Sequence, residues 1–156
     1  LDLDLVIMDN IDGFFTYKPD EFCIIENWTQ PGQGIGNSSV YRYRADAHTD
    51  VFEDFERRHE EIYRTITNEQ TYLTWEVGKK HTVAFWPDAW CRSFKRHCVP
   101  NRFLRLFISP QQPEGCKILV FHGPPKPIDA AYGRWPQKRK FLRPSPWILD
   151  YWKESA

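Results

Sequence analysis

The stretch Val120-Phe121-His122-Gly123-Pro124-Pro125-Lys126-Pro127 joins a predicted strand to a predicted turn. Residues 117–121 are mostly apolar and β-prone, which predicts a buried strand that ends where His122 emerges. Gly123 and the three prolines exclude regular structure after that point. An imidazole and the Lys126 ammonium group are therefore close in the chain at a strand end, which favours chemistry on an anion.

The length and charge of the chain limit its class. Its 156 residues correspond to about one domain and can bury a substantial core. The formal net charge is zero, so we expect no nucleic-acid partner. No apolar run approaches the roughly 20 residues of a membrane-spanning helix, and nothing resembles a signal peptide. We therefore expect a soluble, cytoplasmic protein.

The cysteine and aromatic residues each have an ordinary structural interpretation. The cysteines lack the paired C-x-x-C spacing of a structural zinc site, so we expect reduced, partly buried thiols at Cys23, Cys91, Cys98 and Cys116. Aromatic residues make up 16% of the chain, which suits both core packing and stacking on sugar rings. Four tryptophans are candidate platforms for an acceptor: Trp86, Trp90, Trp147 and Trp152.

Hydrophobic patterns elsewhere predict further strands and two helices. Strands are expected at residues 5–8, 22–25, 40–44 and 82–85. A helix is expected over residues 51–65, with Asp50 as its N-cap. A second helix is expected to begin at Thr67, whose capping box would include Gln70, and to stop at Gly78.

The remaining segments predict loops and one short helix. Residues 31–36 are rich in glycine and predict a loop. Ser145-Pro146 predicts the start of a short aromatic helix, and Lys138-Arg139-Lys140 is a solvated basic run. No internal repeat or linker is apparent. Residues 1–156 are therefore interpreted as a single α/β domain with a mixed sheet and flanking helices.

The acidic start of the chain offers a partner for His122 and Lys126. Asp2 and Asp4 are two residues apart, so their carboxylates point the same way from an extended backbone. Both can reach one divalent cation, and a histidine in the same shell favours Mn²⁺ over Ca²⁺. A lysine nearby adds a charge for a diphosphate without competing for the metal. These four residues therefore suit a metal-diphosphate site.

Four segments, in this order, resemble metal-dependent nucleotide-sugar glycosyltransferases of the glycogenin-like kind. Asp2-Leu3-Asp4-Leu5-Val6-Ile7 followed by Ile11-Asp12-Gly13-Phe14-Phe15 resembles their DxD segment. Asn37-Ser38-Ser39-Val40 is similar to their Asn-Ser-Gly-Val segment, and Asn68-Glu69-Gln70 resembles their acid-Gln pair at a helix start. His122-Gly123-Pro124-Pro125-Lys126-Pro127 resembles their closing His-x-x-Gly-x-x-Lys-Pro motif. In the family the histidine lies three residues before the glycine, where this chain has Val120.

The resemblance implies the C-terminal portion of a nucleotide-diphospho-sugar transferase fold that uses Mn²⁺ or Mg²⁺. The expected partners are a nucleotide-sugar donor and a carbohydrate or other hydroxyl acceptor. The matching positions are the metal ligands Asp2, Asp4 and His122, the diphosphate-binding residues Gly123 and Lys126, the sugar-binding residues Asn37 and Ser38, and the catalytic residues Glu69 and Gln70. Because the fold holds the nucleotide base largely in the half before the DxD segment, we expect an incomplete catalytic domain.

Two other functions use the same residues. In a carbohydrate-binding module without turnover, the aromatic surface would hold a sugar and the aspartates would bind nothing. In a metal-dependent phosphoesterase, the carboxylates and His122 would act on a phosphate ester. The basic residues Arg92, Lys95 and Arg96 suit either a bound phosphate or a solvated surface, and Gln70 suits either catalysis or helix capping.

Overall fold

The computed structural model describes residues 1–137 and 140–153 of the chain. Lys138 and Arg139 of the predicted basic run lie outside the described residues. Contacts between Cα atoms divide the chain into two compact units. The first unit contains Leu1 and Asp12–Asp88, and the second contains Asp2–Ile11 and Ala89–Ala156.

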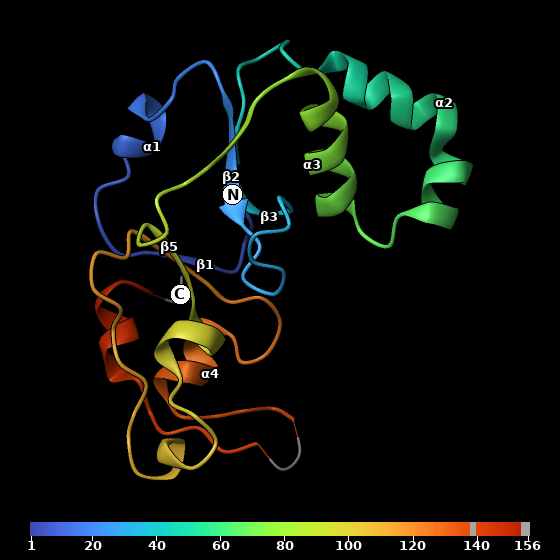
Figure 1. Cartoon of the computed structure of the whole chain (residues 1–156). Helices are drawn as coiled ribbons and strands as arrows, with labels where there is room; N and C mark the ends of the chain where they lie inside the picture. Colours follow the sequence, from blue (N-terminus) through green and yellow to red (C-terminus); the bar gives the residue numbers. More distant parts are fainter. Residues whose placement is uncertain (138–139, 154–156) are drawn as a thin grey trace. The chain divides into compact units, whose positions relative to one another are not determined.

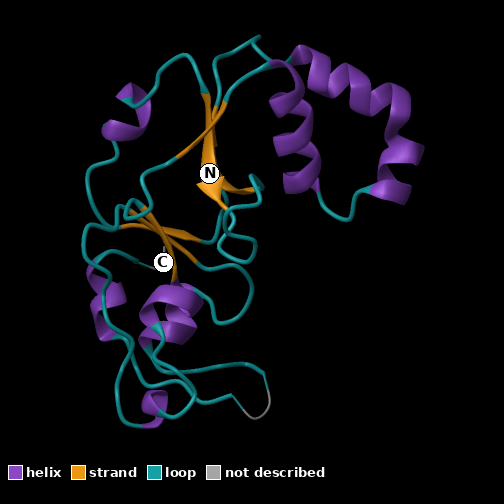
Figure 2. Cartoon of the chain, in the orientation of Figure 1, coloured by secondary structure: helices purple, strands orange, loops and turns teal. Residues whose placement is uncertain are grey.

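The first unit combines a three-stranded sheet with two long helices (Figures 1 and 2). Strand β2 is antiparallel to β3 and parallel to β4, in the order β3-β2-β4. The elements, in chain order, are α1 (Gly13–Thr16), β2 (Phe22–Glu26), β3 (Gly36–Arg42), α2 (Thr49–Thr65), α3 (Glu69–Lys80) and β4 (Val83–Phe85). Helix α3 packs against β3 and against α2. The buried core consists of Phe22, Ile24, Val51, Ile62, Tyr72 and Val77.

Helices α2 and α3 form a hairpin that is held together by polar as well as apolar contacts. The Tyr72 hydroxyl of α3 donates a hydrogen bond of 2.8 Å to the carbonyl oxygen of Val51 in α2. On the surface of α2, Arg58 forms ion pairs with Asp54 and Glu61. Because these partners lie three and four residues from Arg58, they support the helix along its exposed face.

Both predicted helix starts are wrong by one or two residues. His48 rather than Asp50 is the N-cap of α2, and no side chain caps that helix start. Asn68 rather than Thr67 is the N-cap of α3, because its side-chain oxygen accepts a hydrogen bond of 3.0 Å from the Thr71 amide. An asparagine carboxamide at this position satisfies a backbone donor that has no partner within the helix.

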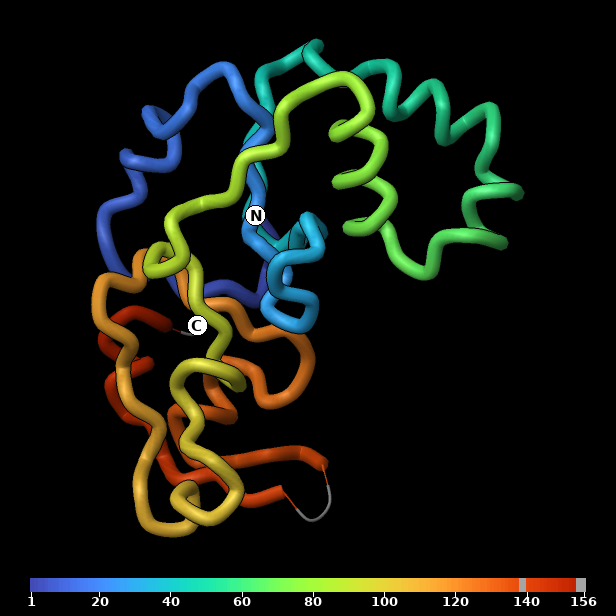
Figure 3. The backbone as a smooth tube through the Cα atoms, viewed as in Figure 1, coloured from blue at the N-terminus to red at the C-terminus, as the bar shows by residue number. Residues whose placement is uncertain are grey.

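The second unit is built on a three-stranded sheet that pairs the start of the chain with a late strand. Strand β1 (Leu5–Ile7) is antiparallel to β6 (Ile118–Val120), and β5 (Cys91–Ser93) is parallel to β6. Leu5 pairs with Val120, so the residues just before β1 meet the residues just after β6. The backbone trace in Figure 3 follows both strands.

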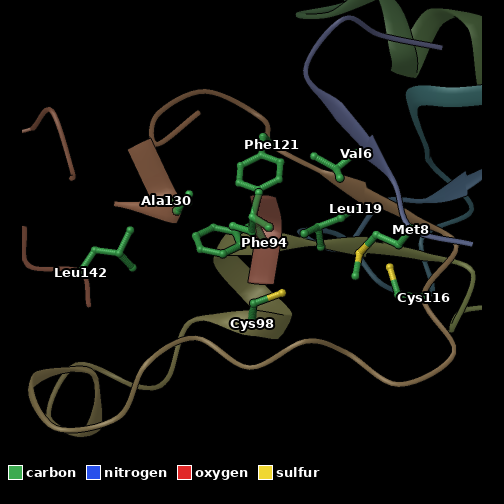
Figure 4. Packing of buried hydrophobic residues seen from close by; sticks show 11 residues of the cluster. Val6, Met8, Phe94, Cys98, Cys116, Leu119, Phe121, Ala130 and Leu142 are labelled. Atoms are coloured by element: carbon green, nitrogen blue, oxygen red, sulfur yellow. The ribbon is translucent and has the colours of Figure 1, made fainter. Parts of the chain in front are cut away.

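Short helices complete the second unit around a buried core. They are a π-helix (Phe94–Cys98), two 3-10 helices (Leu104–Leu106 and Pro146–Asp150) and α4 (Pro127–Ala131). The rings of Phe94 and Phe121 stack with centroids 4.8 Å apart, and both side chains are almost fully buried (Figure 4). Cys98 and Cys116 pack in the same cluster. All four cysteines are buried free thiols.

The expectation of a mixed α/β structure with flanking helices is confirmed at this level, with two small mixed sheets. One strand boundary is wrong, because β3 begins at Gly36 and includes residues that were predicted to belong to a loop or to precede the strand. The glycine allows this because its backbone lies against Ile24 and Thr74, where a side chain would not fit. No helix within residues 1–137 and 140–153 is long and apolar enough to cross a membrane.

Candidate functional site

Strand pairing in the second unit brings Asp4 together with the segment after β6. The Phe121 amide donates a hydrogen bond of 3.0 Å to the carbonyl oxygen of Asp4. The Asp4 carboxylate also accepts a hydrogen bond from Lys126 Nζ at 2.7 Å, with 25% of the Asp4 side chain and 51% of the Lys126 side chain exposed. Asp4 and Lys126, which are far apart in the sequence, thus form one polar group beside His122.

His122 is half-buried and is held by its neighbours on β5 and the π-helix. Its Nε2 atom lies 2.6 Å from Ser93 Oγ, and Ser93 is fully buried. Its carbonyl oxygen accepts a hydrogen bond from Lys95. Burial lowers the pKa of His122, the charges of Lys95 and Arg96 lower it further, and Asp4 opposes them. The imidazole is therefore favoured in the neutral form that ligates metals.

Positive charge gathers around this group. Burial lowers the pKa of Lys95, and the charges of Lys140, Arg96 and Lys126 lower it further, while Asp4 opposes them. Gly123 has a φ of +71°, and a Cβ added there would lie 3.7 Å from Lys95 Nζ. A glycine at this turn therefore permits the backbone conformation and leaves space beside the ammonium group. The arrangement suits an anion such as a phosphate.

The side chains of this group are of types that bind divalent metals. Asp4 offers a carboxylate and His122 a neutral imidazole, both of which Mn²⁺ accepts. Asp2 is exposed beside them in the chain. The ligand atoms of Asp2, Asp4 and His122 do not all lie within 4.8 Å of one another, as those of His48, Asp50 and His81 do. The metal therefore stays a prediction for these residues.

The other predicted site residues form a separate polar group in the first unit. Asn37 Nδ2 of β3 donates a hydrogen bond of 3.3 Å to Gln70 Oε1 at the start of α3. The next pair along, Ser38 Oγ and Glu69 Oε1, is also hydrogen-bonded. A further hydrogen bond of 3.0 Å from the Gly36 amide to Thr74 Oγ1 holds β3 against α3. The predicted sugar-binding and catalytic residues are thus direct neighbours.

The aromatic residues proposed as acceptor platforms are largely structural. Trp86 is 5% exposed, and its indole N–H donates a hydrogen bond of 3.0 Å to the Val40 carbonyl oxygen. Trp147 donates a hydrogen bond of 3.0 Å to the Pro110 carbonyl oxygen, and both Trp147 and Trp152 pack against the core of the second unit. The interpretation of Trp86 as a platform is wrong, because its ring is covered within the first unit.

Sequence reasoning identified most of the charged groups but not their buried support. Lys95 and Arg96 lie in a basic run, which was interpreted as suiting either a bound phosphate or a solvated surface. Ser93 had no such signal, since a serine beside a basic run is common on protein surfaces.

Comparison of the chain with family models, curated proteins and solved structures found no match.

Proposed function

We propose that the chain forms part of a metal-dependent transferase that moves a sugar from a nucleotide-diphosphate donor to an acceptor hydroxyl. The observation that carries the proposal is the grouping of Asp4, His122 and Lys126 at the end of the second unit's sheet where β1 begins and β6 ends. The carboxylate and the imidazole suit a divalent cation, and the lysine suits a diphosphate. The acceptor would be a carbohydrate or another compound with a free hydroxyl.

Each residue of the group has a role in this proposal. Asp4 and His122, with Asp2, would hold Mn²⁺ or Mg²⁺, which when bound would neutralise charge developing on the departing diphosphate. Lys126 and Lys95 would bind the diphosphate oxygens as fixed positive charges. The open turn at Gly123 would let these oxygens approach the backbone.

The polar group of the first unit is considered by itself. From the resemblance, Asn37 and Ser38 are proposed to bind a sugar, and their side chains offer both hydrogen-bond donors and acceptors. Glu69 and Gln70 are proposed as catalytic residues from the resemblance described above. Their mutual hydrogen bonds hold all four side chains in defined positions, as a binding site requires.

Calorimetric titration with UDP tests the proposal. We expect saturable binding that requires Mn²⁺ and that Asp4→Asn and Lys126→Met each weaken. A hydrogen bond to a charged group contributes about 1.5–3 kcal/mol, so each variant should lower the affinity by about ten- to one-hundred-fold or slightly more. The ion pair itself is partly exposed, so its loss should cost at most about 1 kcal/mol of stability. Reduced binding would therefore not reflect unfolding.

The same pair of strands offers a matched control. At the opposite end of β1 and β6, Lys117 Nζ lies 3.1 Å from Asp9 Oδ2. This is an ion pair of the same type, formed by residues that flank the same two strands. Asp9→Asn and Lys117→Met should leave UDP binding unchanged. Binding that needs no Mn²⁺, or that all four variants reduce equally, would overturn the proposal. Release of inorganic phosphate without sugar transfer would instead indicate the phosphoesterase.

A further inference from the structure

Three side chains with metal-binding atoms gather where α2 begins and α3 ends. His48 is the N-cap of α2, Asp50 lies in its first turn, and His81 is the C-cap of α3. One ligand atom from each lies within 4.8 Å of the other two. The two imidazole rings are 4.6 Å apart, centroid to centroid, and nearly perpendicular. This His-Asp-His group shares no residue with the proposed metal-diphosphate and sugar-binding groups.

The helical hairpin fixes the three residues in place. In Figure 1 the start of α2 and the end of α3 lie at the same end of the hairpin. Lys80 Nζ, one residue before His81, lies 2.6 Å from Asp50 Oδ2 and ties the two helix ends together. The hydrogen bond from the Tyr72 hydroxyl to the Val51 carbonyl oxygen also joins the two helices. Two helix ends therefore present the ligands, so the group does not depend on a long loop.

One nitrogen in this group is unexplained by the rest of the structure. His48 Nδ1 is buried and has no hydrogen-bond partner among the described residues. Buried polar atoms are nearly always paired, and leaving one unpaired costs about 1–3 kcal/mol. The His48 side chain also forms no cap on α2, although it occupies the N-cap position. A ligand for this nitrogen would account for a buried nitrogen atom on a half-buried imidazole at the helix start.

The surroundings leave room for a small cation and its water. His48 and His81 line a pocket of about 180 Å³, which Asp20, Glu21 and Arg44 also line. Arg44 lies 3.9 Å from Asp20, and Lys18 pairs with Glu21, so both carboxylates already have a cationic partner.

We propose that His48, Asp50 and His81 bind a zinc ion that fastens the start of α2 to the end of α3. Two imidazoles and one carboxylate suit Zn²⁺ better than Mg²⁺ or Ca²⁺, which prefer oxygen ligands. Three protein ligands leave a fourth tetrahedral position open to the pocket, where water would bind. Lys80 orients the Asp50 carboxylate from outside the ligand set, as outer partners of metal ligands commonly do.

Titration of the metal-free full chain with zinc chloride tests this site. Because a site that accepts Mn²⁺ also accepts Zn²⁺, the titration uses the Asp4→Asn/His122→Gln double variant, which lacks two of the metal ligands proposed for the donor. In it we expect one saturable site by calorimetry, a rise in the temperature of unfolding, and visible absorption bands when Co²⁺ replaces Zn²⁺. His81→Ala should abolish all three signals without unfolding the chain, because His81 is exposed. Lys80→Met should weaken zinc binding by about ten- to one-hundred-fold while leaving the stoichiometry unchanged, since it removes only the outer partner.

Two controls separate this site from other histidines. His59 is exposed on the same helix, so His59→Ala should leave zinc binding unchanged. Because the double variant lacks His122 and Asp4, zinc that it binds does not occupy the proposed donor site. Absence of saturable zinc binding in this variant would overturn the proposal. So would binding that persists when His81→Ala is added to it.

Discussion

Replacing Gly36 by alanine should separate β3 from α3. A Cβ built on Gly36 would lie 2.5 Å from Ile24 Cδ1 and 2.8 Å from Thr74 Oγ1. Ile24 and Thr74 are both buried, so neither side chain can turn into solvent. The Gly36 amide also donates a hydrogen bond of 3.0 Å to Thr74 Oγ1. A shift that relieves the contact would therefore lengthen this bond.

The change in the free energy of unfolding follows from two destabilising contributions and one stabilising contribution. Overpacking a well-packed core costs about 1–3 kcal/mol, and a weakened buried hydrogen bond costs up to about 1.5 kcal/mol more. Alanine restricts the unfolded chain and returns about 0.4–1 kcal/mol. We therefore expect Gly36→Ala to lower the free energy of unfolding of the first unit by about 2 kcal/mol, within a range of about 0–4 kcal/mol.

Gly78 provides a matched control in the adjoining helix. It is exposed within α3, and a Cβ added there would lie 3.8 Å from Val83 Cγ2, an ordinary contact. Gly78→Ala should therefore raise the free energy of unfolding by about 0.5–1 kcal/mol, because alanine is the better helix former. The same chemical change is thus expected to have opposite signs at two neighbouring positions.

Amide hydrogen exchange in β3 and α3 measures this prediction. Because the chain has two compact units, local exchange reports on the first unit more directly than a single unfolding midpoint does. Exchange in both elements should be faster in Gly36→Ala and slower in Gly78→Ala than in the unmodified chain. Unchanged or slower exchange in Gly36→Ala would refute the argument from close packing.

Two further predictions concern the core and the surface. Phe121→Ala should lower the free energy of unfolding in urea by about 3–5 kcal/mol, because it removes a buried stacked ring. Phe107→Ala, at a 78% exposed position, should change it by no more than about 0.5 kcal/mol. Equal losses of stability in the two variants would contradict the packing described. The hydrogen bonds from Arg58 hold the pKa of Glu61 below its usual value, so this stabilisation is present above the unfolded pKa and is lost as the pH falls through the folded pKa. Glu61→Gln should therefore lower the unfolding temperature at neutral pH but not in acid, whereas Glu60→Gln, 3.9 Å from its arginine, should show less pH dependence.

The strands were predictable where a short apolar run has few alternatives. Residues 118–120 and the first two residues of 5–7 are buried, and the composition indicates strand in both places. Their antiparallel pairing was not predictable, because it joins residues more than 110 positions apart. The grouping of Asp4 with Lys126 depends on that pairing. The complementary chemistry of the two segments and their family resemblance indicated that Asp4 and Lys126 belong together.

The His-Asp-His group shows a different limit of sequence reasoning. His48 and His81 each look ordinary, since a single histidine near a helix end is common. They become neighbours only because α2 and α3 form a hairpin whose outer ends meet. Two predicted helices joined by a short loop indicate a hairpin whose outer ends are close. Their predicted bounds, however, place Asp50 and Lys79 at those ends rather than His48 and His81. No local motif could have supplied this grouping.

The start of α3 decides how Gln70 can be interpreted. The sequence is compatible with Gln70 either as the capping-box partner of Thr67 or as part of a site. Because Asn68 is the N-cap and accepts from the Thr71 amide, capping does not require Gln70. Its side chain instead bonds Asn37 across the gap between helix and strand. Gln70→Ala therefore removes the proposed catalytic group while leaving the cap intact, so a loss of transfer in this variant cannot be attributed to an unravelled helix start.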